Sequence, residues 1–201
     1  MPKAFSETEK IIIKKEMITV TKDLLNTHGA KKVTVDDIVH AIGIAKGSFY
    51  LFYDSKEHLF YEVFRIYHDQ IQDDFIASLK AHAHVLDKDS LLNAIMTLIR
   101  SLDDTFMYHF IADKALDKIM RKLPIELVED HQKRDELVFY ELTSLFPNQP
   151  VEKILLFGSS LRLLMTSLLH KRDIGEVIYY DTLAFSIKAI INQLLTEEDH
   201  D

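Results

Sequence analysis

Histidine and aspartate side chains are the residues in this sequence that are best suited to bind a metal ion. His82 and His84 are separated by one residue, while His109 and Asp113 are four residues apart and would share one helix face. Neither group supplies the three or four protein ligands of a zinc site. We therefore interpret these imidazoles as solvated side chains, and we expect no metal ion and no cofactor.

Nucleophilic side chains are no better placed for chemistry. The chain has no cysteine, which excludes a thiolate nucleophile, Cys-ligated zinc and a disulfide framework. Ser159, Ser160 and Ser167 lack the glycine-framed turn between strand and helix that exposes a catalytic serine. The sequence contains no P-loop or dinucleotide-binding fingerprint. We expect that the protein is not an enzyme, and the lack of cysteine favours a cytoplasmic location.

Lysine and aromatic side chains gather in a short segment near residue 50. Lys46 and Tyr50 are four residues apart and therefore share one face of a helix, and we expect Tyr53 on the same outer face. Phe49 and Phe52 would form the opposite, apolar face. Because ammonium and hydroxyl groups bind phosphate oxygens, this segment is suited to a nucleic acid.

The composition of the 201 residues is typical of a folded protein without a membrane span, with 47% apolar and 28% charged residues. Five glycines and four prolines are too few for the frequent turns of a β-sandwich, so we predict an all-α fold. The most apolar stretch, 154–169, is interrupted by Arg162 and is too short to cross a bilayer. The charged amino terminus excludes a secretory leader, and we expect no membrane partner.

The charge is distributed unevenly along the chain. The net charge is −8, but residues 1–60 carry nine lysines and eight acidic residues and so have a charge of +1, which leaves −9 for residues 61–201. A lysine-bearing first quarter joined to an acidic remainder indicates two units with different partners.

Apolar periodicity and capping residues predict the elements that position the lysine and tyrosine side chains. A first helix over 7–28, with Ile11, Ile12 and Ile18 among its periodic apolar positions, should end at Gly29. Thr34 and the carboxylate three residues later should cap a second helix over 35–42, which ends at Gly43. We expect about nine helices and no strands; those after Gly43 cover about 45–53, 54–79, 90–102, 105–123, 125–146, 151–171 and 176–195.

Two short helices joined by a tight glycine-containing turn are typical of the helix-turn-helix motif, whose second helix enters the major groove of DNA. The run 33–60 resembles the amino-terminal signature of the TetR family of transcriptional repressors, and the resemblance extends over roughly residues 8–64. Its matching positions are Gly29, Thr34, Gly43, the recognition segment Lys46-Gly47-Ser48-Phe49-Tyr50, Ser55-Lys56-Glu57 and Leu59-Phe60.

The resemblance implies a helix-turn-helix DNA-binding domain over 1–53 and a helical ligand-binding and dimerisation domain over 54–201. It implies a homodimer that binds a palindromic double-stranded DNA operator and is released by an unidentified small-molecule effector. Three positions depart from the family pattern: Ala45, Val39 and Leu51. An alternative is therefore a helical small-molecule-binding or scaffold protein that has lost DNA binding.

Candidate DNA contacts follow from the matched positions. Lys46, Gly47 and Ser48 are candidates for contacts to base edges, and Leu51 could contact a thymine methyl group. The candidates for phosphate contacts are Thr34, Tyr50 and Lys56.

Apolar side chains in the acidic remainder supply the candidate effector pocket and dimer interface. Helical periodicity favours core positions for most of them, and the resemblance implies that some line a ligand pocket: Phe64, Tyr67, Phe106, Tyr108, Phe110, Phe139, Tyr140 and Met165. The last two predicted helices carry more apolar residues than one core needs, which favours a four-helix contact between two chains. Its candidates are Ile154, Phe157, Gly158, Leu161, Met165, Leu168, Leu183, Ile187 and Ile190.

Overall fold

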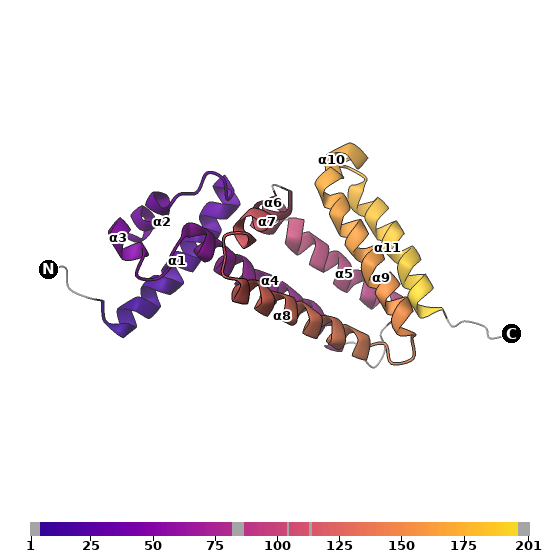
Figure 1. The fold of residues 1–201 in the computed structure, drawn as a ribbon. Coiled ribbons are helices and arrows are strands. Elements are labelled where there is room, and N and C mark those ends of the chain that lie inside the picture. The colour runs from indigo at the N-terminus through magenta and orange to yellow at the C-terminus, as the bar shows by residue number, and fades with distance from the viewer. Residues whose placement is uncertain (1–4, 82–86, 104, 113, 197–201) are drawn as a thin grey trace. The chain divides into compact units, whose positions relative to one another are not determined.

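The computed structural model describes residues 5–81, 87–103, 105–112 and 114–196, apart from the side chains of residues 109, 111, 112, 132, 135 and 139. Helices make up its regular structure and no strand occurs in these ranges, so the predicted all-α fold is confirmed (Figure 1). No helix within them is both long and apolar enough to cross a membrane.

The chain forms two compact units. Unit 1 comprises residues 1–68 and 105–130, and unit 2 comprises residues 69–104 and 131–201. Two helices, α4 (Lys56–Ala81) and α8 (Ile125–Ser144), contribute residues to both units. The units are defined by packing, so the functional boundary after residue 53 stays a prediction.

Unit 1 begins with two helices whose amino termini are capped by side chains, and only the second of these caps was predicted. In α1 (Glu7–His28) the Ser6 hydroxyl accepts a hydrogen bond from the Glu9 amide, and the Glu9 carboxylate accepts one from the Ser6 amide. Thr34 and Asp37 form the same reciprocal pair at the start of α2 (Val35–Ile42). Gly43 ends α2 in the left-handed region, with φ 73° and ψ 31°, a conformation that favours glycine.

The buried face of α1 differs from the predicted one. Ile13, Met17, Thr21 and Leu25, spaced four residues apart, are its buried positions, whereas Ile11 and Ile12 are exposed and Ile18 is half-buried. Eight apolar positions in this helix allow more than one stripe at helical spacing, and packing selected the stripe that ends at Leu25.

The predicted third helix over 45–53 is too long. Helix α3 spans only Lys46–Phe49, and residues 50–52 form turns in which the Phe49 carbonyl accepts hydrogen bonds from the amides of Phe52 and Tyr53 at 3.0 and 3.1 Å. Ala45 precedes α3 and has no polar side-chain atom that could cap it.

The remainder of unit 1 packs on the first part of α4. The predicted helix 105–123 is divided into α6 (Phe106–Ala112) and α7 (Ala115–Met120), with Lys114 in the left-handed region at φ 48° between them. The Phe64 ring stacks on Phe110 at 6.0 Å, and Phe110 meets Phe106 edge-on at 5.2 Å. The Tyr61 hydroxyl donates a 2.7 Å hydrogen bond to the Leu127 carbonyl at the start of α8.

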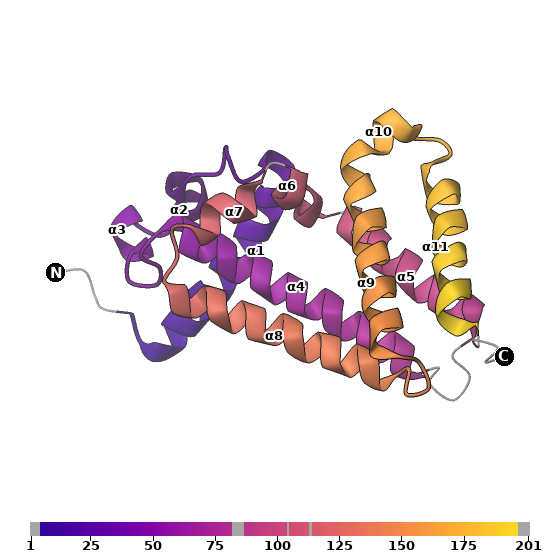
Figure 2. The ribbon, with the colours of Figure 1, turned by 45° about the vertical axis from the view of Figure 1, so that its right-hand side comes forward.

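In unit 2, α11 (Tyr179–Leu195) packs against α5 (Lys88–Asp103) and α9 (Val151–Thr166), and Figure 2 shows α9 and α11 side by side. The predicted helix 151–171 is divided into α9, the 3₁₀ turn η2 (Ser167–His170) and α10 (Lys171–Ile174). The hydroxyls of Thr166 and Ser167 donate to the carbonyls of Leu163 and Leu164, and such bonds compete with regular helix. The helices therefore exceed the number predicted.

A charged cluster joins the end of α5 to α10 and α11. The Asp103 carboxylate accepts hydrogen bonds from the Lys171 ammonium at 2.6 Å and from the Tyr180 hydroxyl, and the Arg100 guanidinium lies 4.2 Å from the Tyr180 ring centre. Burial acts to raise the pKa of Asp103, but the hydrogen bonds from Lys171 and Tyr180 outweigh it and hold the pKa below its usual value. Asp103 is therefore ionised in the folded protein at neutral pH.

Replacing Asp103 by Asn should lower the free energy of unfolding at pH 7 by about 1–3 kcal/mol, because Lys171 and Tyr180 lose their charged acceptor. A carboxyl group that has a lower pKa in the folded than in the unfolded protein stabilises the fold at pH values above its pKa in the unfolded protein. This contribution is lost as the pH falls through the pKa of the folded state. The free energies of unfolding of the wild type and Asp103→Asn, measured with urea, should therefore differ most at pH 7, and the difference should shrink below about pH 4. Asp89→Asn, an exposed change on the same helix, is the control; an effect of Asp103→Asn that does not vary with pH would contradict the assignment.

Candidate nucleic-acid interface

The helix-turn-helix of unit 1 exposes most of the predicted recognition segment. Tyr50 and Leu51 are 53% and 69% exposed, and Lys46 and Gly47 are exposed beside them, while Ser48 is half-buried. Phe49 is fully buried between them, as predicted. The segment 46–51 therefore presents ammonium, hydroxyl, backbone and apolar groups on one short, accessible stretch.

The prediction that Tyr53 lies on the outer face is wrong. Tyr53 is buried, and its ring packs 6.0 Å from the Phe49 ring because the turns at 50–52 rotate it inward. Burial, followed by the neighbouring charge of Glu62, raises the pKa of the Tyr53 hydroxyl far above its usual value. The Tyr53 ring therefore packs against the buried side chain of α3, and the Tyr53 hydroxyl stays protonated at neutral pH.

Lys46 forms an ion pair with a residue that the sequence analysis did not consider. Its ammonium lies 2.7 Å from the Asp36 carboxylate in the first turn of α2, and both side chains are largely exposed. The hydrogen bond to Asp36, and then the charge of that carboxylate, raise the pKa of Lys46. A DNA phosphate that contacts Lys46 must therefore compete with Asp36 or share the ammonium with it.

Thr34 and Lys56 also have bonding partners within the chain. The Thr34 hydroxyl donates to the Asp37 carboxylate at 2.7 Å, so its one donor is used by the cap. The Lys56 ammonium donates to the Val33 carbonyl at 2.8 Å and lies 5.5 Å from the centre of the Phe60 ring. This bond fixes the start of α4 beside the residue that precedes the α2 cap, and it leaves the ammonium two further donors.

The structure thus brings the predicted residues Lys46, Gly47, Ser48, Tyr50 and Leu51 together in one short segment. In contrast, the Thr34 hydroxyl and one donor of the Lys56 ammonium form hydrogen bonds within the chain. Their contacts with DNA stay predictions. Asp36 was missed because its pairing with Lys46 spans ten residues and the turn at Gly43, so helical spacing gives no signal for it.

Residues 17–63 match the family model described as bacterial regulatory proteins of the tetR family. The matched residues run from α1 into α4 and include α2 and α3, so the family likeness lies in the helix-turn-helix segment. No match was found among curated proteins.

Solved structures support the TetR fold over nearly the whole chain. A candidate TetR-family regulator from Mesorhizobium loti MAFF303099 is 18% identical, with a TM-score of 0.69, over 94% of this chain and 98% of its own. A TetR transcription regulator from Haloarcula marismortui is 14% identical, with a TM-score of 0.62, over 92% and 100%. The fatty acid degradation regulator FadR from Bacillus halodurans is 17% identical, with a TM-score of 0.55, over 99% and 100%.

None of the cavities formed by described residues is lined by a residue that was predicted for the effector pocket. Phe64, Phe106 and Phe110 fill the interior of unit 1, and Tyr67 packs edge-on against Phe106 at 5.9 Å. In contrast, Tyr140 is exposed. Tyr108 and Met165 are half-buried, and the Phe139 side chain lies outside the described residues.

An apolar cavity of about 60 Å³ occurs instead in unit 2. Three of its lining residues, Phe157, Gly158 and Leu161, were predicted for the dimer interface rather than for a ligand. The other lining residues come from α4, α5, α8, α9 and the segment after α8: Phe75, Leu79, Leu91, Leu142, Phe146 and Ile154.

Most of the predicted dimer residues are buried within one chain. Phe157, Gly158, Met165 and Ile190 are half-buried, and the buried residues are Ile154, Leu161, Leu168, Leu183 and Ile187. Helical spacing identified a buried stripe, and in this unit that stripe faces the chain's own core. No group of three potential metal ligands occurs among the described residues, and His82, His84, Asp113 and the His109 side chain lie outside them.

Replacing Asp36 by Asn should strengthen binding to a duplex carrying the DNA that flanks the gene, on the order of fivefold at low salt, because it releases Lys46 and removes a negative charge. Lys46→Gln should weaken binding and reduce the salt slope of log K by about one. Fluorescence anisotropy at several salt concentrations measures both effects. Glu141→Gln, which breaks the exposed Lys80–Glu141 ion pair in unit 2, is the matched control. Equal increases in DNA affinity for Asp36→Asn and Glu141→Gln would exclude a competition between Asp36 and a DNA phosphate for Lys46.

Proposed function

We propose that this chain is a TetR-family transcriptional repressor that binds a palindromic operator as a homodimer and leaves it when a small molecule binds. The observation that carries the proposal is the exposed segment 46–51, which is supported by buried Phe49 and Tyr53 and preceded by a left-handed glycine turn. Exposed groups on a rigid short helix are what a major-groove contact requires.

The surface of α9 and α11 supports a homodimer. Leu156 and Leu163 on α9 and Phe185 on α11 are 68%, 72% and 77% exposed, although the two helices pack against each other. Large exposed apolar side chains on neighbouring helices indicate an interaction surface. A second copy of the same two helices would cover them in a four-helix contact, and a twofold assembly matches a palindromic operator. The proposed interface therefore uses these residues instead of the buried stripe.

The apolar cavity of unit 2 supports an apolar effector. Its described lining offers aromatic and aliphatic side chains and the backbone of Gly158, without a charged group. Helix α4 carries Lys56 at its start and Phe75 and Leu79, which line the cavity, near its end. A ligand that favours one position of α4 would change DNA affinity by population shift, and a coupling of about 1–3 kcal/mol gives about 5–150-fold release. The fatty acid degradation regulator among the structural neighbours makes fatty acids suitable probes.

A second candidate function is that of a helical small-molecule-binding or scaffold protein without DNA binding. The pairing of Lys46 with Asp36 favours it, because it neutralises the foremost cation of the recognition segment. A mobility-shift assay with the DNA that flanks the gene separates the two functions. We expect saturable, sequence-dependent binding by the wild type, and binding no stronger than to random duplex would favour the scaffold function.

The dimer is tested by replacing Leu163 and Phe185 together by Asp. Charged groups should repel at the twofold contact, so the mass in light scattering should fall from that of two chains to that of one. Both residues are exposed within the chain, so the helical circular dichroism should not change. Leu137→Asp on α8, where Leu137 is 62% exposed, is the control and should leave the mass unchanged. A wild type with the mass of one chain at the concentrations that bind DNA would contradict the dimer.

The effector cavity is tested with Gly158→Leu in the mobility-shift assay. A Cβ atom at Gly158 would meet no atom within 4 Å, so a leucine can extend into the cavity without displacing backbone. We expect butyrate, a fatty acid short enough for a small cavity, to release the wild type from DNA and to leave the variant bound, with equal DNA affinity of both proteins when no fatty acid is present. Release of the variant at the same butyrate concentration would place the effector elsewhere.

A further inference from the structure

Three helices of unit 1 contact one buried side chain, that of Tyr53. Its ring packs 6.0 Å from the Phe49 ring of α3 and meets the His58 ring of α4 edge-on at 5.6 Å. The ammonium of Lys14 on α1 lies 5.5 Å from the centre of the same ring. Because Phe49 is the buried residue of the short helix α3, a group that fixes Tyr53 also fixes the segment 46–51.

A carboxylate on α4 holds the Lys14 ammonium at this ring. The Glu62 Oε1 atom lies 3.0 Å from the Lys14 Nζ atom, and the Glu62 side chain is 19% exposed. Burial, and then the charge of Glu62, raise the pKa of the Tyr53 hydroxyl, so this carboxylate also acts on Tyr53. Lysine carries a strongly hydrated ammonium on a flexible stem, so without the carboxylate Lys14 would extend into solvent and leave the ring.

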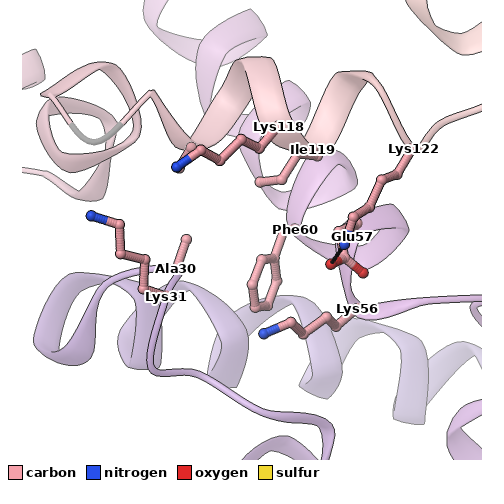
Figure 3. Close-up of a pocket in the computed structure, with 9 residues that line it drawn as sticks. Ala30, Lys31, Lys56, Glu57, Phe60, Lys118, Ile119 and Lys122 are labelled. Atoms are coloured by element: carbon pink, nitrogen blue, oxygen red, sulfur yellow. Dashed lines mark hydrogen bonds and ion pairs between the residues drawn. The ribbon is translucent and has the colours of Figure 1, made fainter.

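A second carboxylate of α4 has the same kind of partner in a different place. Glu57, whose side chain is 17% exposed, accepts a 2.6 Å hydrogen bond from Lys122 in the turn after α7. Figure 3 shows this pair near Phe60, at a cavity of about 180 Å³ in unit 1. Helix α4 therefore carries two similar ion pairs, one that leads to α7 and one, at Glu62, that leads to Tyr53.

We propose that Glu62 is a positioning residue for DNA binding, which holds Lys14 against the Tyr53 ring and thereby fixes the segment 46–51 relative to the start of α4. Its effect on DNA affinity rests on the proposed repressor function, whereas its effect on the segment does not. Removal of a carboxylate by itself favours the binding of polyanionic DNA on every sequence. Weaker binding to specific DNA after removal of the Glu62 charge therefore indicates a change of position rather than a change of charge.

The proposal is tested with Glu62→Gln, which removes the charge and keeps the shape of the side chain. Fluorescence anisotropy compares a duplex carrying the DNA that flanks the gene with a random duplex of equal length. We expect the variant to bind the flanking DNA about fivefold more weakly than the wild type, the scale of one cation–π contact, and the random duplex no more weakly. Lys14→Arg keeps both the ion pair and the contact with the ring, so it should bind like the wild type.

Glu57→Gln is the matched control, since it removes the same charge from the same helix at a similar exposure. It should bind both duplexes at least as strongly as the wild type does, and its stability in urea should be similar to that of Glu62→Gln. Equal affinities of the two variants for the flanking DNA would overturn the proposal. A loss of affinity of Glu62→Gln for both duplexes, in proportion to a loss of stability, would show a merely structural role and overturn it as well.

Amide hydrogen exchange measures the same effect without DNA. The Phe52 amide donates to the Phe49 carbonyl at 3.0 Å, whereas Leu25 is a buried residue near the far end of α1. In Glu62→Gln the Phe52 amide should exchange about fivefold faster relative to the Leu25 amide, and in Glu57→Gln this ratio should equal that of the wild type. If the wild type binds no DNA, the repressor function fails, and the ratio alone decides the positioning role. An unchanged ratio in Glu62→Gln would then overturn the proposal.

Discussion

Burial of Phe49 is the interaction on which the DNA-facing part of this protein depends. Helix α3 has four residues and no side chain at Ala45 that can cap it, and a single helical turn is unstable by itself in water. The Phe49 side chain is fully buried, and Tyr53 packs beside it. The exposed groups of Lys46, Tyr50 and Leu51 therefore keep their positions through hydrophobic packing on the inner side of the same short segment.

Internal polar contacts determine how much of this surface is available to DNA. Asp36 holds the Lys46 ammonium, Asp37 holds the Thr34 hydroxyl, and the Val33 carbonyl holds Lys56. The Thr34–Asp37 and Lys56–Val33 hydrogen bonds stabilise the α2 cap and the start of α4, so these donors contribute to the stability of the fold and are not fully available to DNA. The exposed pair of Lys46 and Asp36 differs, because exposed ion pairs contribute at most about 1 kcal/mol and a phosphate can replace the carboxylate at small cost.

The helices of unit 1 were predictable where a local signal specified them. Thr34 and Gly43 give the bounds of α2, since a capping box and a left-handed glycine act within a few residues. The inward rotation of Tyr53 and the pairing of Lys46 with Asp36 were not predictable, because both depend on turns that bring together residues outside helical spacing. Along α9, spacing predicted a coherent apolar stripe but could not tell whether a partner chain or the chain's own core covers it. In the structure Ile154 and Leu161 face the core.

Charge placement, rather than net charge, makes an acidic chain compatible with a polyanion. The surplus of nine negative charges lies in residues 61–201, whereas residues 1–60 carry +1. Because charges in solution are screened over about 8 Å at physiological ionic strength, distant carboxylates repel DNA far less than one adjacent carboxylate does. Asp36, in contact with Lys46, therefore affects the interface more than the acidic remainder as a whole.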